Sequence, residues 1–92
     1  MSPEQTLGEG IDHRTDIYSL GVMIYELTTG RVPFPTGDIG YHHLHTPPTP
    51  PNEMNPEIPE PLSKIILKCM EKDKEKRYQA AAEIIKDLDF VL

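Results

Sequence analysis

The segment from Ile17 to Leu27 limits what this 92-residue chain can fold into more than any other part of the sequence. Only Ser19 and Glu26 in it are clearly polar, so a helix formed by this segment has no side suited to water. A helix that crosses a bilayer needs about 20 apolar residues, and this segment is roughly half that long. We therefore predict a central helix of a globular domain, which needs protein around it on all sides.

Both ends of this helix carry residues typical of helix termini. Asp16 precedes the apolar segment, where its carboxylate can accept backbone N–H bonds and interact with the positive end of the helix dipole. Gly30 follows the segment and suits a left-handed C-cap. The central helix is thus expected to begin near Asp16 and to end before Gly30.

A second helix is predicted from Pro61 to Met70, because apolar residues recur there at helical spacing and proline is tolerated in a first turn. The residues on its apolar face are Leu62, Ile65, Ile66, Cys69 and Met70. At this spacing Ser63, Lys64 and Lys68 lie outside the apolar face. The helix should therefore pack against the core by one side.

A third helix is predicted from about Ala80 to the C-terminus, again with one apolar stripe. The stripe consists of Ala81, Ile84, Ile85, Leu88 and Leu92. Ala80 is a weak N-cap, although Glu83 is placed to bond back to the start of the helix.

The remaining segments are expected to be irregular. Residues 1–14 have no sustained period, and residues 71–77 alternate in charge as a solvated connector does. Residues 33–61 hold nine of the ten prolines, which favours a long extended loop with room for a short helix between Asp38 and His45. No segment alternates long enough to predict a strand. The expected fold class is mostly α, with a long Pro-rich loop.

Composition excludes some classes of partner. The net charge of −6 argues against a nucleic-acid or anionic-membrane surface, and hence against a three-helix DNA-binding domain. Cys69 is the single cysteine and is expected to be a small buried hydrophobe in a reducing compartment. No leader pattern or second long apolar segment is found, so we expect a cytoplasmic location.

Three histidines, His42, His43 and His45, raise the question of a metal site. Their spacing suits a strand better than a helix, and no cysteine or carboxylate stands at ligand spacing. We therefore expect that these histidines bind no metal and that their imidazole rings face water.

Three motifs, in order along the chain, resemble those of protein kinases. The D-I-Y-S-L-G-V segment from Asp16 resembles the start of the long buried helix of the C-terminal lobe. The M-S-P-E-Q segment from Met1 resembles the A-P-E motif that ends the activation segment, in a form common among bacterial-type serine/threonine kinases. The D-K-E-K-R-Y segment from Asp73 resembles the motif before the last helix, with Lys74 where proline is usual.

The resemblance implies that residues 1–92 form a partial kinase domain, from the end of the activation segment to the last helix of the C-terminal lobe. The parent protein would use ATP and magnesium to phosphorylate serine or threonine of protein substrates. The Gly-rich loop, the phosphate-gripping lysine and the magnesium-binding residues are not found in this segment. The H-R-T-D sequence at 13–16 is not a catalytic loop, because Thr15 interrupts the motif. This segment alone is thus expected to have no catalytic residue, to bind no ATP and to be inactive.

The resemblance also implies supporting roles for five residues. Asp16 would bond to the backbone of the catalytic loop, and Met23 and Leu27 would support apolar side chains reaching toward the adenine pocket. A plain helix cap and ordinary core packing explain these three residues equally well. Glu4 and Arg77 would form an ion pair; breaking such a pair when it is buried costs about 3–5 kcal/mol.

Two interpretations of function follow. The first is a fragment of a serine/threonine kinase, and the alternative is a stand-alone interaction module derived from a kinase lobe. In the first interpretation much of the lobe that normally surrounds the central helix would be missing, so much of that helix should be exposed. We therefore expect self-association through it.

Overall fold

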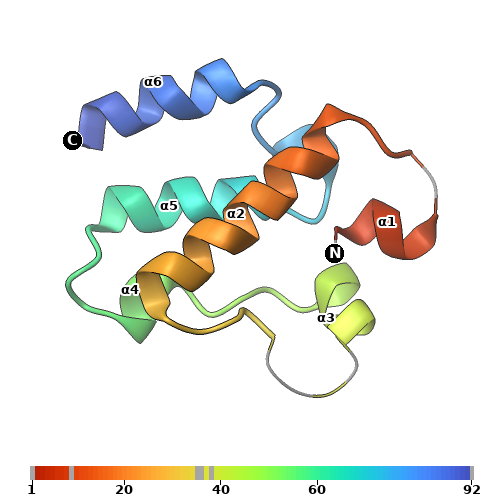
Figure 1. The fold of residues 1–92 in the computed structure, drawn as a ribbon, viewed down its shortest axis with the longest axis horizontal. Coiled ribbons are helices and arrows are strands. Elements are labelled where there is room, and N and C mark those ends of the chain that lie inside the picture. The colour runs from red at the N-terminus through yellow and green to blue at the C-terminus, as the bar shows by residue number, and fades with distance from the viewer. Residues whose placement is uncertain (1, 9, 35–36, 38, 92) are drawn as a thin grey trace.

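The computed structural model describes residues 2–8, 10–34, 37 and 39–91. These residues form six α-helices, one short 3₁₀-helix and no strand, which confirms the predicted mostly α class. The helices are α1 (Pro3–Leu7), α2 (His13–Thr29), α3 (Ile39–His45), α4 (Pro51–Met54), α5 (Glu60–Cys69) and α6 (Ala81–Val91), with η1 (Lys74–Lys76) before α6. Helix α2 crosses the middle of the molecule against α5, and α6 lies along the other side of α5 (Figure 1). Met1, Asp38 and Leu92, on which predictions were also placed, lie outside the described residues.

Helix α2 begins one turn before the predicted residue. Its N-cap is Asp12, whose Oδ1 accepts the backbone N–H of Arg14 at 2.8 Å. Asp16 lies in the first turn, as predicted, and is exposed, but it is not the residue at which the helix begins. The earlier start has a physical cause, because the Arg14 side chain also holds the Asp12 carboxylate at 2.8 Å. The predicted end is confirmed: Gly30 has φ 73°, and its N–H donates to Glu26 O at 2.8 Å.

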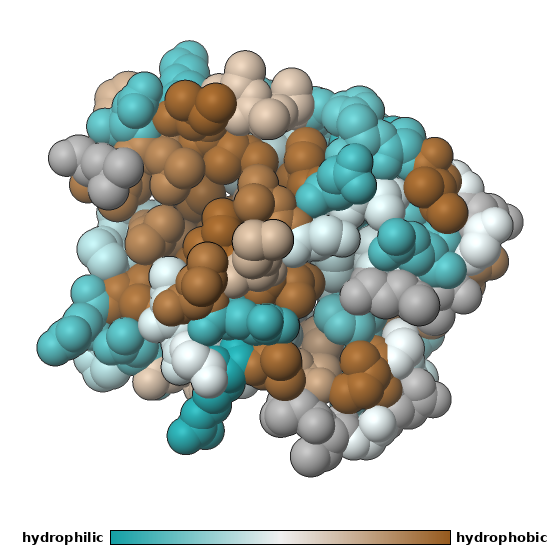
Figure 2. Space-filling model, in the orientation of Figure 1, coloured by the Kyte–Doolittle hydropathy of each residue, from teal (hydrophilic) through white to brown (hydrophobic). Residues whose placement is uncertain are grey.

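The apolar surface of α2 is covered on one side only. Ile17, Tyr18 and Tyr25 are buried, whereas Met23 is 57% and Leu27 79% exposed. Figure 2 shows hydrophobic surface gathered on the face where α2 and α6 lie toward the viewer. The helix is thus not enclosed on all sides in this chain, and the expectation that much of it is exposed is confirmed.

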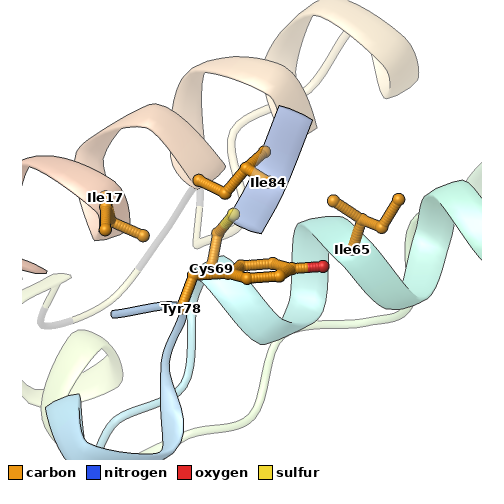
Figure 3. Close-up of a cluster of buried hydrophobic side chains, with 5 residues drawn as sticks. All are labelled: Ile17, Ile65, Cys69, Tyr78 and Ile84. Carbon is orange, nitrogen blue, oxygen red and sulfur yellow. The ribbon is translucent and has the colours of Figure 1, made fainter. Parts of the chain in front are cut away.

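Two clusters of buried side chains join α2 to α5. One contains Ile17, Ile65, Cys69, Tyr78 and Ile84 (Figure 3). The other contains Tyr18, Tyr25, Ile66 and Met70. The apolar face predicted for α5 is therefore confirmed, and Cys69 is a buried free thiol whose pKa burial raises to about 12.

Gly21 lets α2 and α5 approach closely. A Cβ at this position would lie 2.6 Å from the Cβ of Cys69 and 2.9 Å from the Cγ of Met70. We expect Gly21→Ala to lower the free energy of unfolding by about 1–3 kcal/mol, because overpacking outweighs the better helix propensity of alanine. Urea unfolding followed by circular dichroism measures the change, with Ser19→Ala on the exposed side of α2 as the control. A Gly21→Ala variant as stable as the control would contradict this close packing.

Ser63 was predicted to lie outside the apolar face of α5, but it is buried, with 2% of its surface exposed. Its hydroxyl donates to Asn52 Oδ1 at 3.2 Å, because the short helix α4 packs over this side of α5. Helix α4 itself was missed within the Pro-rich segment. Its four residues are too few to show a period, and its only signal is Pro51 at a first-turn position.

Helix α6 packs against α5 through a narrower face than predicted. Ile84 is buried and Leu88 and Val91 are partly buried, whereas Ala81 and Ile85 are exposed. The predicted stripe is therefore wrong at these two exposed positions. The predicted role of Glu83 is confirmed, since its Oε1 accepts the backbone N–H groups of Gln79 at 2.6 Å and of Ala80 at 3.0 Å.

Helix α1 lies where an irregular segment was predicted. Ser2 caps it: the Ser2 hydroxyl accepts the N–H of Gln5 at 3.2 Å, and the Gln5 side chain accepts the N–H of Ser2 at 2.9 Å. Gly8 ends the helix with φ 74°. The S-P-E-Q sequence is a capping box, which could have revealed this helix.

Candidate functional site

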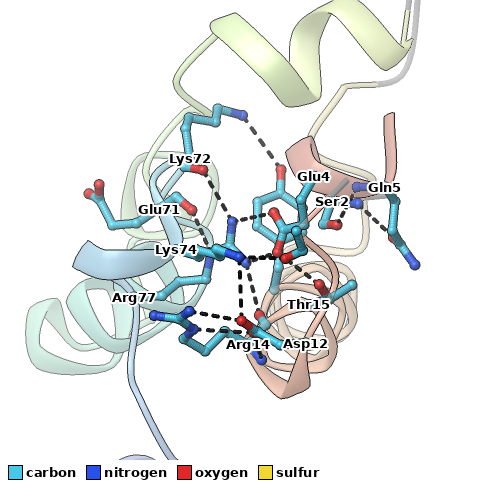
Figure 4. Close-up of polar contacts among 12 residues, drawn as sticks. Ser2, Glu4, Gln5, Asp12, Arg14, Thr15, Glu71, Lys72, Lys74 and Arg77 are labelled. Atoms are coloured by element: carbon cyan, nitrogen blue, oxygen red, sulfur yellow. Dashed lines mark hydrogen bonds and ion pairs between the residues drawn. The ribbon is translucent and has the colours of Figure 1, made fainter. Parts of the chain in front are cut away.

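Glu4 on α1 and Arg77 after η1 form a buried ion pair across 73 positions of the sequence. Arg77 Nη1 donates to Glu4 Oε2 at 2.7 Å, and Arg77 Nη2 donates to Glu4 Oε1 at 2.8 Å (Figure 4). Two parallel charge-assisted bonds of this length fix both distance and orientation. The predicted contact is therefore present, and it holds α1 against the segment between α5 and α6.

The other donors of Arg77 are also satisfied. They bond to the backbone carbonyl oxygens of Glu71 at 2.7 Å, Arg14 at 2.9 Å and Lys72 at 3.2 Å. All five N–H groups of the guanidinium thus have an acceptor. The guanidinium also lies over the ring of Tyr18, 5.0 Å from its centre. Arg77 therefore fastens α1, the start of α2 and the connector at one point.

Thr15 on α2 completes the environment of the Glu4 carboxylate. Its hydroxyl donates to Glu4 Oε2 at 2.8 Å, the same oxygen that accepts from Arg77 Nη1. The Arg77 hydrogen bond is the main reason that the pKa of Glu4 falls to about 2. The carboxylate is therefore ionised at neutral pH despite its burial.

The connector at residues 71–77 is not wholly solvated, contrary to prediction. Arg77 is buried and Lys72 is half-buried, because both side chains turn inward toward Tyr18. Burial lowers the pKa of Lys72 to about 8. Charge alternation predicts an exposed segment, but it does not distinguish the cations whose side chains point into the protein.

A second buried polar contact joins α2 to α3. The Tyr18 hydroxyl and His43 Nδ1 lie 2.6 Å apart, and His43 is only 4% exposed. The ring of Phe34 packs edge-on against the imidazole with centres 5.0 Å apart. Burial lowers the pKa of His43 to about 4, and the nearby Lys72 cation acts in the same direction.

The expectation that the three histidines face water is therefore wrong for His43. His45 is exposed, and His42 is half-buried with its Nδ1 2.9 Å from the hydroxyl of Thr46. Within the described part of the chain, no group of three or more histidine, cysteine or carboxylate side chains could hold a metal ion.

None of the described helices has the length and apolar character needed to cross a membrane.

Of the five predicted supporting residues, only Glu4 and Arg77 are brought together. Asp16, Met23 and Leu27 lie on exposed parts of α2. Thr15, Tyr18 and His43 were not predicted as parts of a polar site. Their contacts join separate helices, so no local pattern in the sequence reveals them.

Comparison with known proteins shows the family of this chain. The sequence model of the protein kinase domain matches residues 1–89. The chain belongs to the protein kinase family. This kinase segment is 47% identical over 94 residues to a probable serine/threonine-protein kinase of Clostridium acetobutylicum, in a match covering 99% of the chain and 14% of the relative.

Other bacterial relatives show the same pattern. A probable serine/threonine-protein kinase of Clostridium perfringens is 48% identical over 93 residues, covering 97% of the chain and 13% of the relative. The serine/threonine-protein kinase PknB of Mycobacterium tuberculosis is 42% identical over 92 residues, covering 96% of the chain and 14% of the relative. The kinase segment therefore spans a small part of the length of these relatives. The resemblance to bacterial-type serine/threonine kinases drawn from the three motifs is confirmed.

Proposed function

We propose that this chain is the distal part of the C-terminal lobe of a serine/threonine kinase, from the end of the activation segment to the last helix. The parent protein transfers the γ-phosphate of ATP, with magnesium, to serine or threonine of protein substrates. The observation that carries the proposal is the Glu4–Arg77 pair, because it joins the first and last kinase-like motifs with bonds of 2.7 and 2.8 Å. The Pro-rich segment between α2 and α5 acts as a structural connector.

In this proposal Glu4 and Arg77 anchor the end of the activation segment to the helical lobe. The other supporting residues face the rest of the lobe, which fits their exposure in this chain. Asp16, in the first turn of α2, bonds to the backbone of the catalytic loop. Met23 and Leu27, which are 57% and 79% exposed, support the apolar side chains that reach toward the adenine pocket.

One experiment with two arms tests this function. We expect the complete protein to transfer radiolabelled phosphate from Mg-ATP to serine- or threonine-containing peptides but not to tyrosine-only peptides. We expect the 92-residue chain alone to transfer none and to keep its melting temperature when Mg-ATP is added, since a ligand that binds the folded state raises it. The proposal would be contradicted if the complete protein transferred no phosphate, or if Mg-ATP clearly raised the melting temperature of the 92-residue chain alone.

The alternative function is a stand-alone interaction module that keeps the kinase fold without catalysis. The exposed apolar side chains of α2 favour contact with another protein surface, so we propose that the isolated chain self-associates. We also propose that the protein is located in the cytoplasm. Light scattering at increasing concentration tests this, with Leu27→Glu expected to shift the chain toward monomer. A monodisperse monomer at high concentration would rule self-association out.

A further inference from the structure

A groove of about 410 Å³ lies between α5 and α6, away from the Glu4–Arg77 pair. Its apolar lining includes the buried side chains of Ile65 and Tyr78 and the partly buried Val91. Phe90 also lines it and is 85% exposed, more than any other large hydrophobic side chain in the described residues. The two helices that form the groove lie side by side in Figure 1. Its volume falls within the range of about 300–1,000 Å³ typical of ligand pockets.

The α5 side of this groove carries two cations one helical turn apart. Lys64 and Lys68 both line the groove and are exposed. Lys64 pairs with Glu60 at 3.4 Å, but both side chains are at least 70% exposed, and such pairs contribute little. Lys68 lies over the ring of Tyr78, with its Nζ 4.4 Å from the ring centre. Both ammonium groups can therefore donate to a carboxylate of a partner.

The one carboxylate among the described residues of the lining, Asp87, is already engaged. Its Oδ2 accepts the hydroxyl of Tyr78 at 2.6 Å, and the side chain is half-buried. The open charges at the edge of the groove are therefore positive, on a chain whose net charge is −6.

We propose that this groove binds a short acidic peptide segment of a partner protein. One aromatic or branched apolar side chain of the peptide packs against Phe90 and Ile65, and flanking carboxylates pair with Lys64 and Lys68. Apolar anchors that lie in a groove between helices, with charges at the edge, are a recurring mode of peptide recognition. This binding is separate from phosphoryl transfer and does not require the proposed parent activity.

The test uses the 92-residue chain and the probe acetyl-Asp-Glu-Phe-Leu-Glu-Asp-amide, with amide ¹H–¹⁵N spectra recorded during titration. We expect saturable shifts confined to α5, α6 and the segment around Tyr78, which together line the groove. A probe with all four carboxylates replaced by amides, and a probe with alanine for the phenylalanine and leucine, should each bind more weakly. Higher salt should weaken binding of the acidic probe, because exposed ion pairs are screened.

Protein variants give the decisive comparison. The double variant K64E/K68E should weaken binding about tenfold or more, since reversing two surface ion pairs changes the binding free energy by roughly 1.4 kcal/mol. Phe90→Ala should also weaken it, whereas Lys86→Glu, which reverses an exposed lysine outside the groove, should leave it nearly unchanged. All these side chains are exposed, and the dispersion of the spectrum checks folding. The proposal would be overturned if the probe showed no saturable binding at millimolar concentration, or if the shifts lay outside the residues around the groove. It would also be overturned if Lys86→Glu lost as much affinity for the probe as K64E/K68E.

Discussion

Replacing Arg77 with methionine lowers the free energy of unfolding by about 3–5 kcal/mol, because it leaves the Glu4 carboxylate buried without its cation. It also removes the donors that three backbone carbonyls use. A small domain has only about 5–15 kcal/mol of stability in total, so much of the chain should unfold at low denaturant concentration. Urea titration followed by circular dichroism measures the loss.

The control for this prediction is Arg31→Met, which removes the same charge from an exposed position. It should change stability by less than about 0.5 kcal/mol, as surface substitutions usually do. The double variant Glu4→Leu/Arg77→Met should be more stable than Arg77→Met alone, because it no longer buries an unpaired carboxylate. Equal effects of Arg77→Met and Arg31→Met would mean that the pair contributes little.

Acidification from pH 6.5 to 4 should destabilise the chain through His43. Burial lowers the pKa of this imidazole from 6.5 in the unfolded chain to about 4 in the folded one, so folding favours the neutral form. The contribution is therefore fully present above pH 6.5 and is lost as the pH falls toward 4. A shift of this size corresponds to about 3 kcal/mol.

The surroundings of His43 support this direction. The positively charged Lys72 and the neighbouring His42 both oppose protonation, and Tyr18 supplies a hydroxyl at 2.6 Å. The Glu4 contribution acts at lower pH, since the pKa of that carboxyl is lowered from 4.5 to about 2. The two groups therefore lose their contributions in largely separate pH windows.

Unfolding midpoints in urea between pH 7.5 and 4 measure this dependence. His43→Gln should flatten the curve over this window, at the cost of lower stability at pH 7. His45→Gln, at an exposed position on the same helix, should keep the dependence of the unmodified chain. If the His43→Gln and unmodified chains lose stability in parallel, another group must be responsible.

Elements with a long apolar period could be predicted from the sequence. The buried face of α5 and the end of α2 at Gly30 follow from local spacing and from one backbone conformation. The Glu4–Arg77 contact came from motif resemblance, because no local rule pairs residues 73 positions apart. These particular features could therefore be predicted from local spacing or from a family motif.

Features that depend on tertiary packing could not be predicted in this way. Ser63 is buried because α4 covers it, and His43 is buried because Tyr18 and Phe34 surround it. The exposure of Leu27 was expected only through the family resemblance, because the composition of a single helix does not reveal what lies beside it. The start of α2 was misplaced for a different reason: Asp12 and Asp16 are both suitable caps, and the contact with Arg14 favours the first.

The most direct test of the account is thiol labelling of Leu27→Cys in the 92-residue chain and in the complete protein. The buried Cys69, which is fully enclosed and has a raised pKa, serves as the internal control. We expect rapid labelling at position 27 in the chain under conditions that keep it monomeric, and strong protection in the complete protein if, as proposed, the rest of a kinase lobe covers α2. Equally rapid labelling in both proteins would contradict it.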